Sequence, residues 1–237
     1  MKTARLKLSN PRMMCSNRSM RTKTPDLILN YISELYEPQN IGLTSLLERL
    51  ESHGRLGINI GIIEAQLIKI LMRLYQPKKI VECGTLFGYS TIQMARALEK
   101  NAHIFTIERD LKAAAQAKIS FEECGVADRV TLMIGEVTEK LSELSQLAPF
   151  DMIFIDHHKA GYLVALEWAE KNLRQGGLII ADNTLLWGEV AGEEVTRSSK
   201  KQLEVMRAFN QALSDSKKYT SILLPTSEGL SIAIKEF

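Results

Sequence analysis

Acidic and amide side chains follow two successive apolar runs in the second half of the chain. Asp156 comes directly after the run 152–155, and Asp182 and Asn183 come directly after the run 178–181. If the runs are neighbouring parallel strands, these three side chains meet at one edge of the sheet. Two carboxylates and an amide carbonyl suit a hard cation such as Mg²⁺, which keeps several waters and accepts substrate oxygens. Taken alone, an Asp-Asn pair more often caps a helix.

A second group of residues surrounds a turn that contains two glycines. Gly84 and Gly88 follow the apolar run 79–82, where glycines let the backbone turn tightly and approach a ligand. Glu108 ends the next apolar run, and a carboxylate there can accept hydrogen bonds from both hydroxyls of a ribose. Taken alone, each feature is more typical of a turn glycine and an exposed acid. The GxGxxG fingerprint of dinucleotide-binding proteins is absent, because three other residues separate the two glycines.

These side chains need a sheet whose strand ends lie together, and the chain after Pro77 predicts one. Short apolar runs alternate with longer amphipathic segments, which is typical of βαβ units around a parallel sheet. Strands are expected at 79–82, 103–108, 130–134, 151–155 and 177–181, with helices at 90–99, 111–124, 137–147, 162–173 and 197–213.

The two ends of the chain depart from this alternation. The strands expected at 221–224 and 230–235 are separated by five residues, too few for a helical crossover, so they should pair antiparallel. Before Pro77, apolar residues three and four apart predict three accessory helices within residues 26–76. We therefore expect an α/β fold with a doubly wound, mostly parallel seven-stranded sheet and a C-terminal antiparallel hairpin.

Composition places the chain among ordinary globular proteins, with room for one large domain in its 237 residues. We expect this domain over residues 26–237, with the catalytic core at 77–237. No apolar run approaches the roughly 20 residues of a membrane span, so no membrane partner is expected. The three cysteines include no CxxC pair, which opposes a disulfide framework or a zinc site and fits the cytoplasm.

The positive charge of the chain is concentrated at its N-terminus. Residues 1–25 contain seven Lys and Arg and no acid, whereas the remainder has 23 basic and 28 acidic residues. We interpret residues 1–25 as a basic, flexible tail. A nucleic-acid-contacting arm and an Arg- and Ser-rich transit peptide are the alternatives.

Four motifs occur together along the chain. They are Glu82-x-Gly84-Thr85-x-x-Gly88-Tyr89-Ser90, Phe154-Ile155-Asp156-x-x-Lys159, Gly176-Gly177-x-Ile179-x-x-Asp182-Asn183 and Leu224-Pro225-x-x-x-Gly229-Leu230. Their order and spacing resemble the caffeoyl-CoA and catechol O-methyltransferase family, which includes bacterial members and tRNA hydroxyuridine methyltransferases. The likeness covers about residues 26–237 and outweighs the capping and turn interpretations, because four separate coincidences would otherwise be needed.

The resemblance implies the Rossmann-like fold of class I methyltransferases, with S-adenosylmethionine as cofactor and Mg²⁺, or Mn²⁺ or Ca²⁺ in its place, as metal. It assigns Asp156, Asp182 and Asn183 to the metal and Glu108 to the cofactor ribose. The full set implied for the cofactor is Glu82, Gly84, Tyr89, Ser90, Glu108, Gly135, Glu136, Val137 and Asp156. Glu136 departs from the family, which usually has Asp near the adenine.

Lys159 matches the proposed general base of the family. An ammonium near a divalent cation and a sulfonium has its pKa lowered toward the range that is useful for proton abstraction. The expected reaction is attack of a metal-bound substrate oxygen on the methyl carbon of S-adenosylmethionine. His157 and His158 stand where many relatives have Ala-Asp, and we interpret them as residues in or behind the substrate pocket.

The expected acceptor is a small catechol-like or hydroxylated aromatic molecule, and the expected assembly is a cytoplasmic homodimer. A tRNA hydroxyuridine is an alternative acceptor, favoured by the basic tail but opposed by the acidic body. A protein carboxylate or hydroxyl is another. A nicotinamide-dependent oxidoreductase is opposed by the missing glycine fingerprint and the terminal hairpin. A non-catalytic binding module is opposed by the intact set Asp156, Lys159, Asp182 and Asn183.

Overall fold

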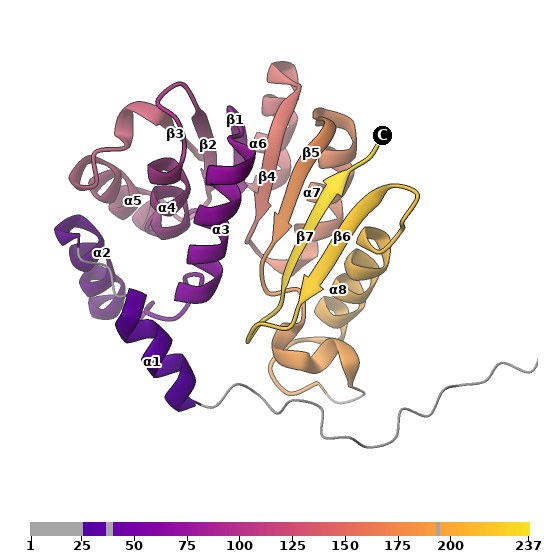
Figure 1. Ribbon diagram of the computed structural model, residues 1–237, viewed down its shortest axis with the longest axis horizontal. Helices are drawn as coiled ribbons and strands as arrows, with labels where there is room; N and C mark the ends of the chain where they lie inside the picture. The colour runs from indigo at the N-terminus through magenta and orange to yellow at the C-terminus, as the bar shows by residue number, and fades with distance from the viewer. Residues whose placement is uncertain (1–25, 37–39, 193–194) are drawn as a thin grey trace, which may run out of the picture.

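A single seven-stranded sheet runs through the computed structural model, which describes residues 26–36, 40–192 and 195–237 (Figure 1). The strand order is β3-β2-β1-β4-β5-β7-β6. All pairs from β3 to β5 are parallel, whereas β7 pairs antiparallel with both β5 and β6. The mostly parallel sheet with a terminal antiparallel hairpin is therefore confirmed. The basic segment 1–25 lies outside the described residues.

The observed elements follow the expected pattern closely. The strands are β1 (Lys79–Cys83), β2 (His103–Glu108), β3 (Val130–Ile134), β4 (Phe150–Ile155), β5 (Leu173–Ala181), β6 (Tyr219–Leu224) and β7 (Leu230–Lys235). The helices are α1 (Asp26–Tyr36), α2 (Ile41–Ser52), α3 (Ile62–Tyr75), α4 (Tyr89–Ala97), α5 (Leu111–Glu123), α6 (Val137–Leu144), α7 (Tyr162–Asn172) and α8 (Lys200–Leu213). No helix among the described residues is long and apolar enough to cross a membrane.

Two of the boundaries that differ from the expectation have clear local physical reasons. β5 starts at Leu173 rather than at 177, because Gly176 adopts a φ of 71° that lets the strand bend and continue. α8 starts at Lys200 rather than at 197, because Ser199 and Gln202 form a capping box that fixes the first turn there.

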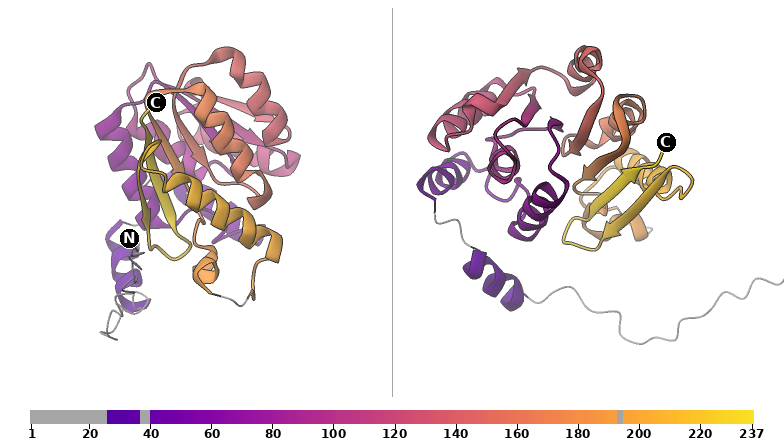
Figure 2. Two further views of the ribbon diagram at one scale, coloured as in Figure 1. Left: turned by 90° about the vertical axis from the view of Figure 1, so that its right-hand side faces the viewer. Right: turned by 45° about the horizontal axis from the view of Figure 1, so that its top comes forward.

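Helices cover both faces of the sheet, as the two views in Figure 2 show. The α2, α3, α4 and α5 helices pack on one face, and α6, α7 and α8 pack on the other. In β4, Met152 and Phe154 face the first layer, whereas Ile153 and Ile155 face the second. Burial on both faces explains why the parallel strands appear in the sequence as unbroken apolar runs.

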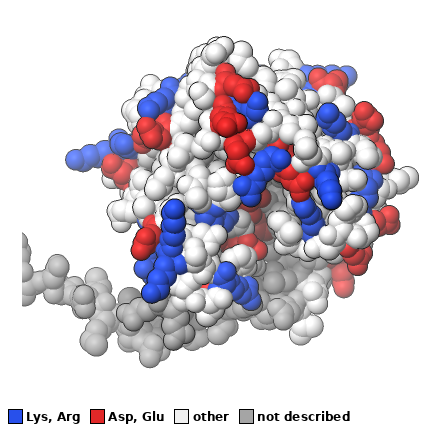
Figure 3. Space-filling model, turned by 180° about the vertical axis from the view of Figure 1, so that it is seen from behind, with Lys and Arg blue, Asp and Glu red and all other residues white. Residues whose placement is uncertain are grey.

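Most charged side chains lie at the surface, outside these layers. On the face seen in Figure 3, acidic and basic side chains are interspersed over the surface. Among the described side chains visible on that face, the basic ones form no continuous patch of the kind that binds nucleic acid.

Backbone hydrogen bonds align the carboxyl ends of the five parallel strands. In each case the first residue after one strand donates its N–H to a carbonyl at the end of the neighbouring strand. These bonds, of 2.9 to 3.0 Å, run from Gly135 to Glu108, from Gly84 to Ile107, from Asp156 to Cys83 and from Asp182 to Ile155. The residues predicted to carry the chemistry are thereby brought to one edge of the sheet.

A buried carboxylate joins β1 to its neighbours next to this edge. Glu82 has no exposed surface and accepts hydrogen bonds from the hydroxyls of Ser90, Thr91 and Thr106. Ser90 and Thr91 lie in the first turn of α4 and Thr106 lies in β2, so one carboxylate ties both elements to β1. Burial raises the pKa of Glu82 to about 7 although the three hydroxyls oppose the shift.

We expect Glu82 to make the folded protein less stable as the pH rises. Its pKa is about 7 in the folded chain and 4.5 ordinarily, so the folded state binds the proton more tightly. The resulting stabilisation is complete below the lower value and is lost as the pH rises through the higher one. Glu82→Gln removes this titration. When the pH is raised from about 5 to about 8, the free energy of unfolding of the wild type should therefore fall by about 1 to 3 kcal/mol more than that of the variant.

Urea denaturation of both proteins at the two pH values measures this difference. Equal losses of stability in the variant and the wild type would show that the Glu82 carboxylate is ionised throughout the interval.

Candidate active site

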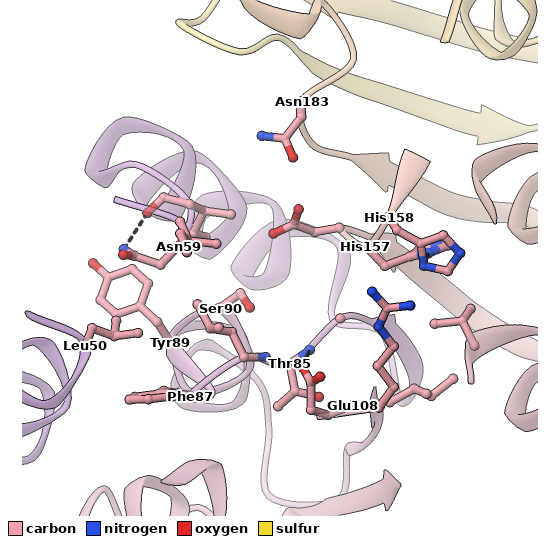
Figure 4. A pocket seen from close by; sticks show the side chains of 18 of the residues that line it. Leu50, Asn59, Thr85, Phe87, Tyr89, Ser90, Glu108, His157, His158 and Asn183 are labelled. Atoms are coloured by element: carbon pink, nitrogen blue, oxygen red, sulfur yellow. Dashed lines mark hydrogen bonds between the residues drawn. The ribbon is translucent and has the colours of Figure 1, made fainter. Parts of the chain in front are cut away.

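Two adjoining cavities open at the carboxyl edge of the sheet, beside the predicted site residues. The first encloses about 270 Å³ between the β1–α4 turn, the ends of β2 and β4, and the α2–α3 connection (Figure 4). The second encloses about 400 Å³ between that connection, the start of α3, the end of β5 and the β6–β7 turn. Asn59, Ile60, Tyr89 and Asn183 line both cavities, so the two form one continuous site.

Most residues predicted to bind the cofactor line the first cavity. Glu82 and Gly135 do not. Glu82 is buried behind Ser90, and Gly135, with a φ of 150°, forms the turn from β3 into α6. These two residues therefore position the wall of the cavity. The residues that do line it are Gly84, Tyr89, Ser90, Glu108, Glu136, Val137 and Asp156.

Gly84 is required by the close approach of two strand ends. Its φ is 101°, and a Cβ atom at this position would lie 1.9 Å from the carbonyl oxygen of Asp156. Any side chain would therefore push β1 and β4 apart at the floor of the first cavity. The glycine of the first motif is thus explained by backbone contact as well as by access for a ligand.

Glu108 holds the β1–α4 turn in place from the end of β2. Its Oε2 accepts hydrogen bonds from the backbone N–H groups of Thr85 and Leu86, at 3.3 and 2.8 Å. Its Oε1 accepts one from the N–H of Asp110 at 2.8 Å. Because a carboxylate offers about four acceptor positions, the side chain retains capacity for the hydroxyl groups of a ligand. The predicted ribose contact and a structural role in the turn are thus compatible.

The three residues predicted to bind metal lie together between the two cavities. Asp156 lines the first cavity, Asp182 the second, and Asn183 both. Burial raises the pKa of both carboxyls, and the charge of Asp156 raises the pKa of Asp182 further. Two carboxyls that oppose each other's ionisation in this way fit a divalent cation, which would neutralise both.

An amide is needed to complete such a site. Within the described parts of the chain, no three His, Cys, Asp or Glu side chains form a group that could hold a metal ion. A cation held by Asp156 and Asp182 would therefore depend on the side-chain carbonyl of Asn183. Asn183 has a φ of 56°, a conformation that asparagine tolerates better than most residues.

Lys159 contacts this group directly. Its Nζ donates hydrogen bonds to Oδ1 of Asn183 at 2.6 Å and to the hydroxyl of Tyr162 at 2.8 Å. The Tyr162 hydroxyl in turn donates to the backbone carbonyl of Asp182 at 2.8 Å. Burial lowers the pKa of Lys159, and the opposing effect of the nearby carboxylates does not fully offset it. The amine therefore gives up its proton more readily than an exposed lysine, as a general base must.

The adjacent histidines line the first cavity rather than the second. The His157 ring packs 5.3 Å from the Tyr162 ring, and its buried Nε2 has no hydrogen-bond partner among the described residues. Burial lowers the pKa of His157 to about 3. His158 is exposed. Both residues therefore border the first cavity, and neither lines the second. Their role in or behind the substrate pocket stays a prediction.

Sequence patterns missed several residues that the fold brings to the site. Tyr162 stands three positions after Lys159 at the start of a helix. This spacing is the sequence signal that could have linked the two residues. Glu64 lies in the first turn of α3, where an acid is also expected for the helix dipole. Glu228 stands in the β6–β7 turn, where the Asn183 amide donates a hydrogen bond to it. Residues 58–60 of the α2–α3 connection belong to no motif.

Known proteins with similar sequences are methyltransferases. The family model described as O-methyltransferase matches residues 38–236. A catechol O-methyltransferase of Niastella koreensis is 37% identical over 186 residues, which are 78% of this chain and 83% of that protein. A caffeoyl-CoA O-methyltransferase of Populus kitakamiensis is 27% identical over 182 residues, which are 74% of this chain and 77% of that protein.

Solved structures agree with the sequence matches. The O-methyltransferase TomG of Streptomyces achromogenes, in complex with SAM, superposes with a TM-score of 0.79 at 28% identity, covering 89% of this chain and 96% of that one. An O-methyltransferase of Bacillus cereus, in complex with SAH, gives a TM-score of 0.80 at 27% identity, covering 89% and 97%. Together with the strand order and the position of the cavities, these matches identify the fold. This chain belongs to the family of S-adenosylmethionine-dependent O-methyltransferases that includes the catechol and caffeoyl-CoA enzymes.

Proposed function

We propose that this enzyme transfers the methyl group of S-adenosylmethionine to a hydroxyl of a small catechol-like or hydroxylated aromatic acceptor, with the help of a divalent cation. The observation that carries this proposal is the junction of two cavities at Asn183, where Asp156 lines one cavity, Asp182 lines the other, and Lys159 is hydrogen-bonded to Asn183. The names of the relatives, catechol and caffeoyl-CoA O-methyltransferase, support the choice of acceptor.

The two cavities divide the substrates between them. The first takes the cofactor, with its ribose at Glu108 and its remaining parts along the β1–α4 turn. The second takes the acceptor, because it adjoins the first at Tyr89 and Asn183 and contains Asp182. An acceptor hydroxyl beside Asp182 and Asn183 then lies at the junction of the two cavities, next to the cofactor, as a direct displacement requires.

Asp156, Asp182 and Asn183 would hold Mg²⁺, or Mn²⁺ or Ca²⁺ in its place. When bound, such an ion supplies Lewis-acid polarisation that lowers the pKa of a substrate hydroxyl. Lys159 accepts the hydroxyl proton. The Lys159 amine donates to Oδ1 of Asn183, the atom offered to the cation, and this carbonyl oxygen has a second lone pair with which it could bind the ion.

A tRNA acceptor receives less support from the described surface. Basic and acidic side chains are interspersed on the face in Figure 3, and three carboxylates line the second cavity. Both features oppose binding of a phosphate backbone. The small-molecule acceptor is therefore the proposal we develop below.

We also propose that the enzyme is a homodimer in the cytoplasm. Buried free thiols at Cys83 and Cys124 support a reducing compartment. Leu27, Ile41 and Leu74, which are 81%, 85% and 78% exposed on α1, α2 and α3, support an interface between subunits. Sedimentation should give twice the mass of the chain, and a monomer at micromolar concentration would contradict the proposal.

Removal of divalent cations should abolish methyl transfer while cofactor binding persists. The expectation follows from the two mutually repelling carboxyls of Asp156 and Asp182. Turnover is measured with excess EDTA and again after addition of Mg²⁺, and S-adenosylhomocysteine binding is measured by calorimetry in both states. Undiminished turnover in EDTA would contradict the metal assignment.

Replacement of Lys159 by Met should lower the turnover number by about 10²- to 10⁴-fold, the usual effect of losing a positioned base, with little change in cofactor affinity. Lys159→Arg should be equally impaired, because a guanidinium keeps the positive charge but does not lose its proton near neutral pH. Lys171→Met, at a lysine whose side chain is 68% exposed on α7, is the matched control and should retain full activity.

The pH dependence of the rate separates proton abstraction from mere positioning. A lysine must be neutral to act as a base, so wild-type activity should rise as the pH increases through its lowered pKa, and the Met variant should lack this limb. If both profiles have the same shape and differ less than about threefold in rate, Lys159 only positions Asn183 and the acceptor.

A further inference from the structure

The connection between α2 and α3, residues 53–61, forms part of the wall of both cavities. Its residues 58–60 line the first cavity, where Figure 4 labels Asn59. Residues 56–57 and 59–61 line the second cavity. The position of this one segment therefore sets the shape of both spaces.

Few contacts hold the backbone of this connection in place. Gly54 and Gly57 have φ values of 65° and 85°, and a Cβ atom at either position would meet no other atom within 4 Å. Ile60 is the one residue of the segment that is buried. Because glycine rotates freely in this region of φ and no neighbour blocks it here, the segment needs a further contact to stay over the cavities.

One ion pair supplies that contact. The Arg55 guanidinium donates a hydrogen bond of 2.7 Å to Oδ2 of Asp110, and the two side chains are 34% and 33% exposed. Every other hydrogen bond that residues 53–61 form with a described residue stays within residues 49–65. The bond from Arg55 lowers the pKa of the Asp110 carboxyl below its ordinary value, so both groups are charged at neutral pH.

Asp110 is itself fixed to the wall of the first cavity. Its N–H donates to Oε1 of Glu108 at 2.8 Å. Its Oδ1 caps α5 by accepting from the N–H groups of Lys112 and Ala113, which leaves Oδ2 for Arg55. A continuous series of hydrogen bonds therefore joins the connection to the carboxylate that is predicted to hold the cofactor ribose.

We propose that Arg55 is a positioning residue, whose ion pair with Asp110 holds the α2–α3 connection over the two cavities and thereby strengthens the binding of cofactor and acceptor. This inference rests on the proposed function, because it takes the first cavity as the cofactor site and the second as the acceptor site. A ligand bound at Glu108 and a connection held by Arg55 then stabilise each other, since such a coupling is reciprocal.

Hydrogen exchange of the segment 53–61 tests the tether without any turnover. In Arg55→Met the amides of this segment should exchange about 2- to 5-fold faster than in the wild type, the range expected for loss of a partly exposed ion pair. Arg55→Lys keeps the charge and should restore part of the protection. S-adenosylhomocysteine should slow the exchange in the wild type more than in Arg55→Met.

Binding and kinetics test the consequence for the ligands. The dissociation constant of S-adenosylhomocysteine and the KM for catechol should each rise by about 2- to 5-fold in Arg55→Met. The value of kcat should change by less than about twofold, because the tether contacts no reacting atom. At about 1 M salt, which screens an ion pair of this exposure, the affinities of variant and wild type should converge.

Two further variants assign the effect to the ion pair. Asp110→Asn removes the charge but keeps a side-chain oxygen that can cap α5. The double variant with Arg55→Met should be no weaker than the Arg55→Met variant, because both changes remove the same contact. Glu123→Gln is the matched control, since it breaks the salt bridge with Arg49, which also joins α2 to α5 but lines neither cavity.

The outcomes separate this inference from the proposed function. If Arg55→Met equals Glu123→Gln in exchange and in cofactor affinity, or if the double variant loses the sum of both single effects, the positioning role is wrong even where methyl transfer occurs. If the tether strengthens the binding of S-adenosylhomocysteine and catechol but no hydroxylated aromatic is methylated, the positioning role is upheld and the proposed function is wrong. Thermal unfolding of each variant shows whether the fold is retained.

Discussion

The alignment of the parallel strand ends is the constraint on which the rest of the site depends. Each chemically important segment begins with a residue whose N–H is bonded to the end of the neighbouring strand. The positions of Asp156 and Asp182 are therefore set by backbone hydrogen bonds and by the packing of both sheet faces. A site built in this way is rigid before any ligand arrives, which lowers the entropic cost of binding and of reaching the reactive geometry.

The same fixed arrangement holds two carboxyl groups of like charge close together, which lowers the stability of the fold. The carboxyls of Asp156 and Asp182 disfavour each other's ionisation, and Lys159 is the described cation in closest contact with the group, through Asn183. Tyr162 fixes Lys159 in turn, since its hydroxyl links the amine to the backbone of Asp182. Unfavourable interactions of this kind are common at active sites. Favourable interactions elsewhere in the fold must offset their effect on stability.

Local patterns predicted the sheet and its terminal hairpin, and the motif resemblance supplied most of the residues that line the first cavity. Strand periodicity and the glycine turn act over a few residues, and the fold then brings Asp156 beside Asp182. The second cavity was not predictable in the same way. Glu64 and residues 58–60 reach it through the tertiary packing of α2 and α3, and their local patterns are those of an ordinary helix start and an ordinary loop. The motif resemblance assigned Glu82 to cofactor binding. No local sequence pattern distinguishes a carboxylate that lines a cavity from one that is buried behind the residues lining it.

The wall shared by the two cavities has a consequence for how this enzyme can change over evolutionary time. Most of the first cavity comes from one continuous stretch, residues 84–158, whereas the second cavity combines the α2–α3 connection with the distant β6–β7 turn. If the second cavity takes the acceptor as proposed, mutations at loop positions that line this cavity alone, such as Leu56, Gly57 and Ser227, can alter the range of acceptors without contacting the cofactor. Mutations at Asn59, Ile60, Tyr89 or Asn183 affect both, so their effects should depend on the residues around them. Libraries that diversify acceptor specificity are therefore best confined to the loop positions that line the second cavity alone, with the residues that line both cavities kept unchanged.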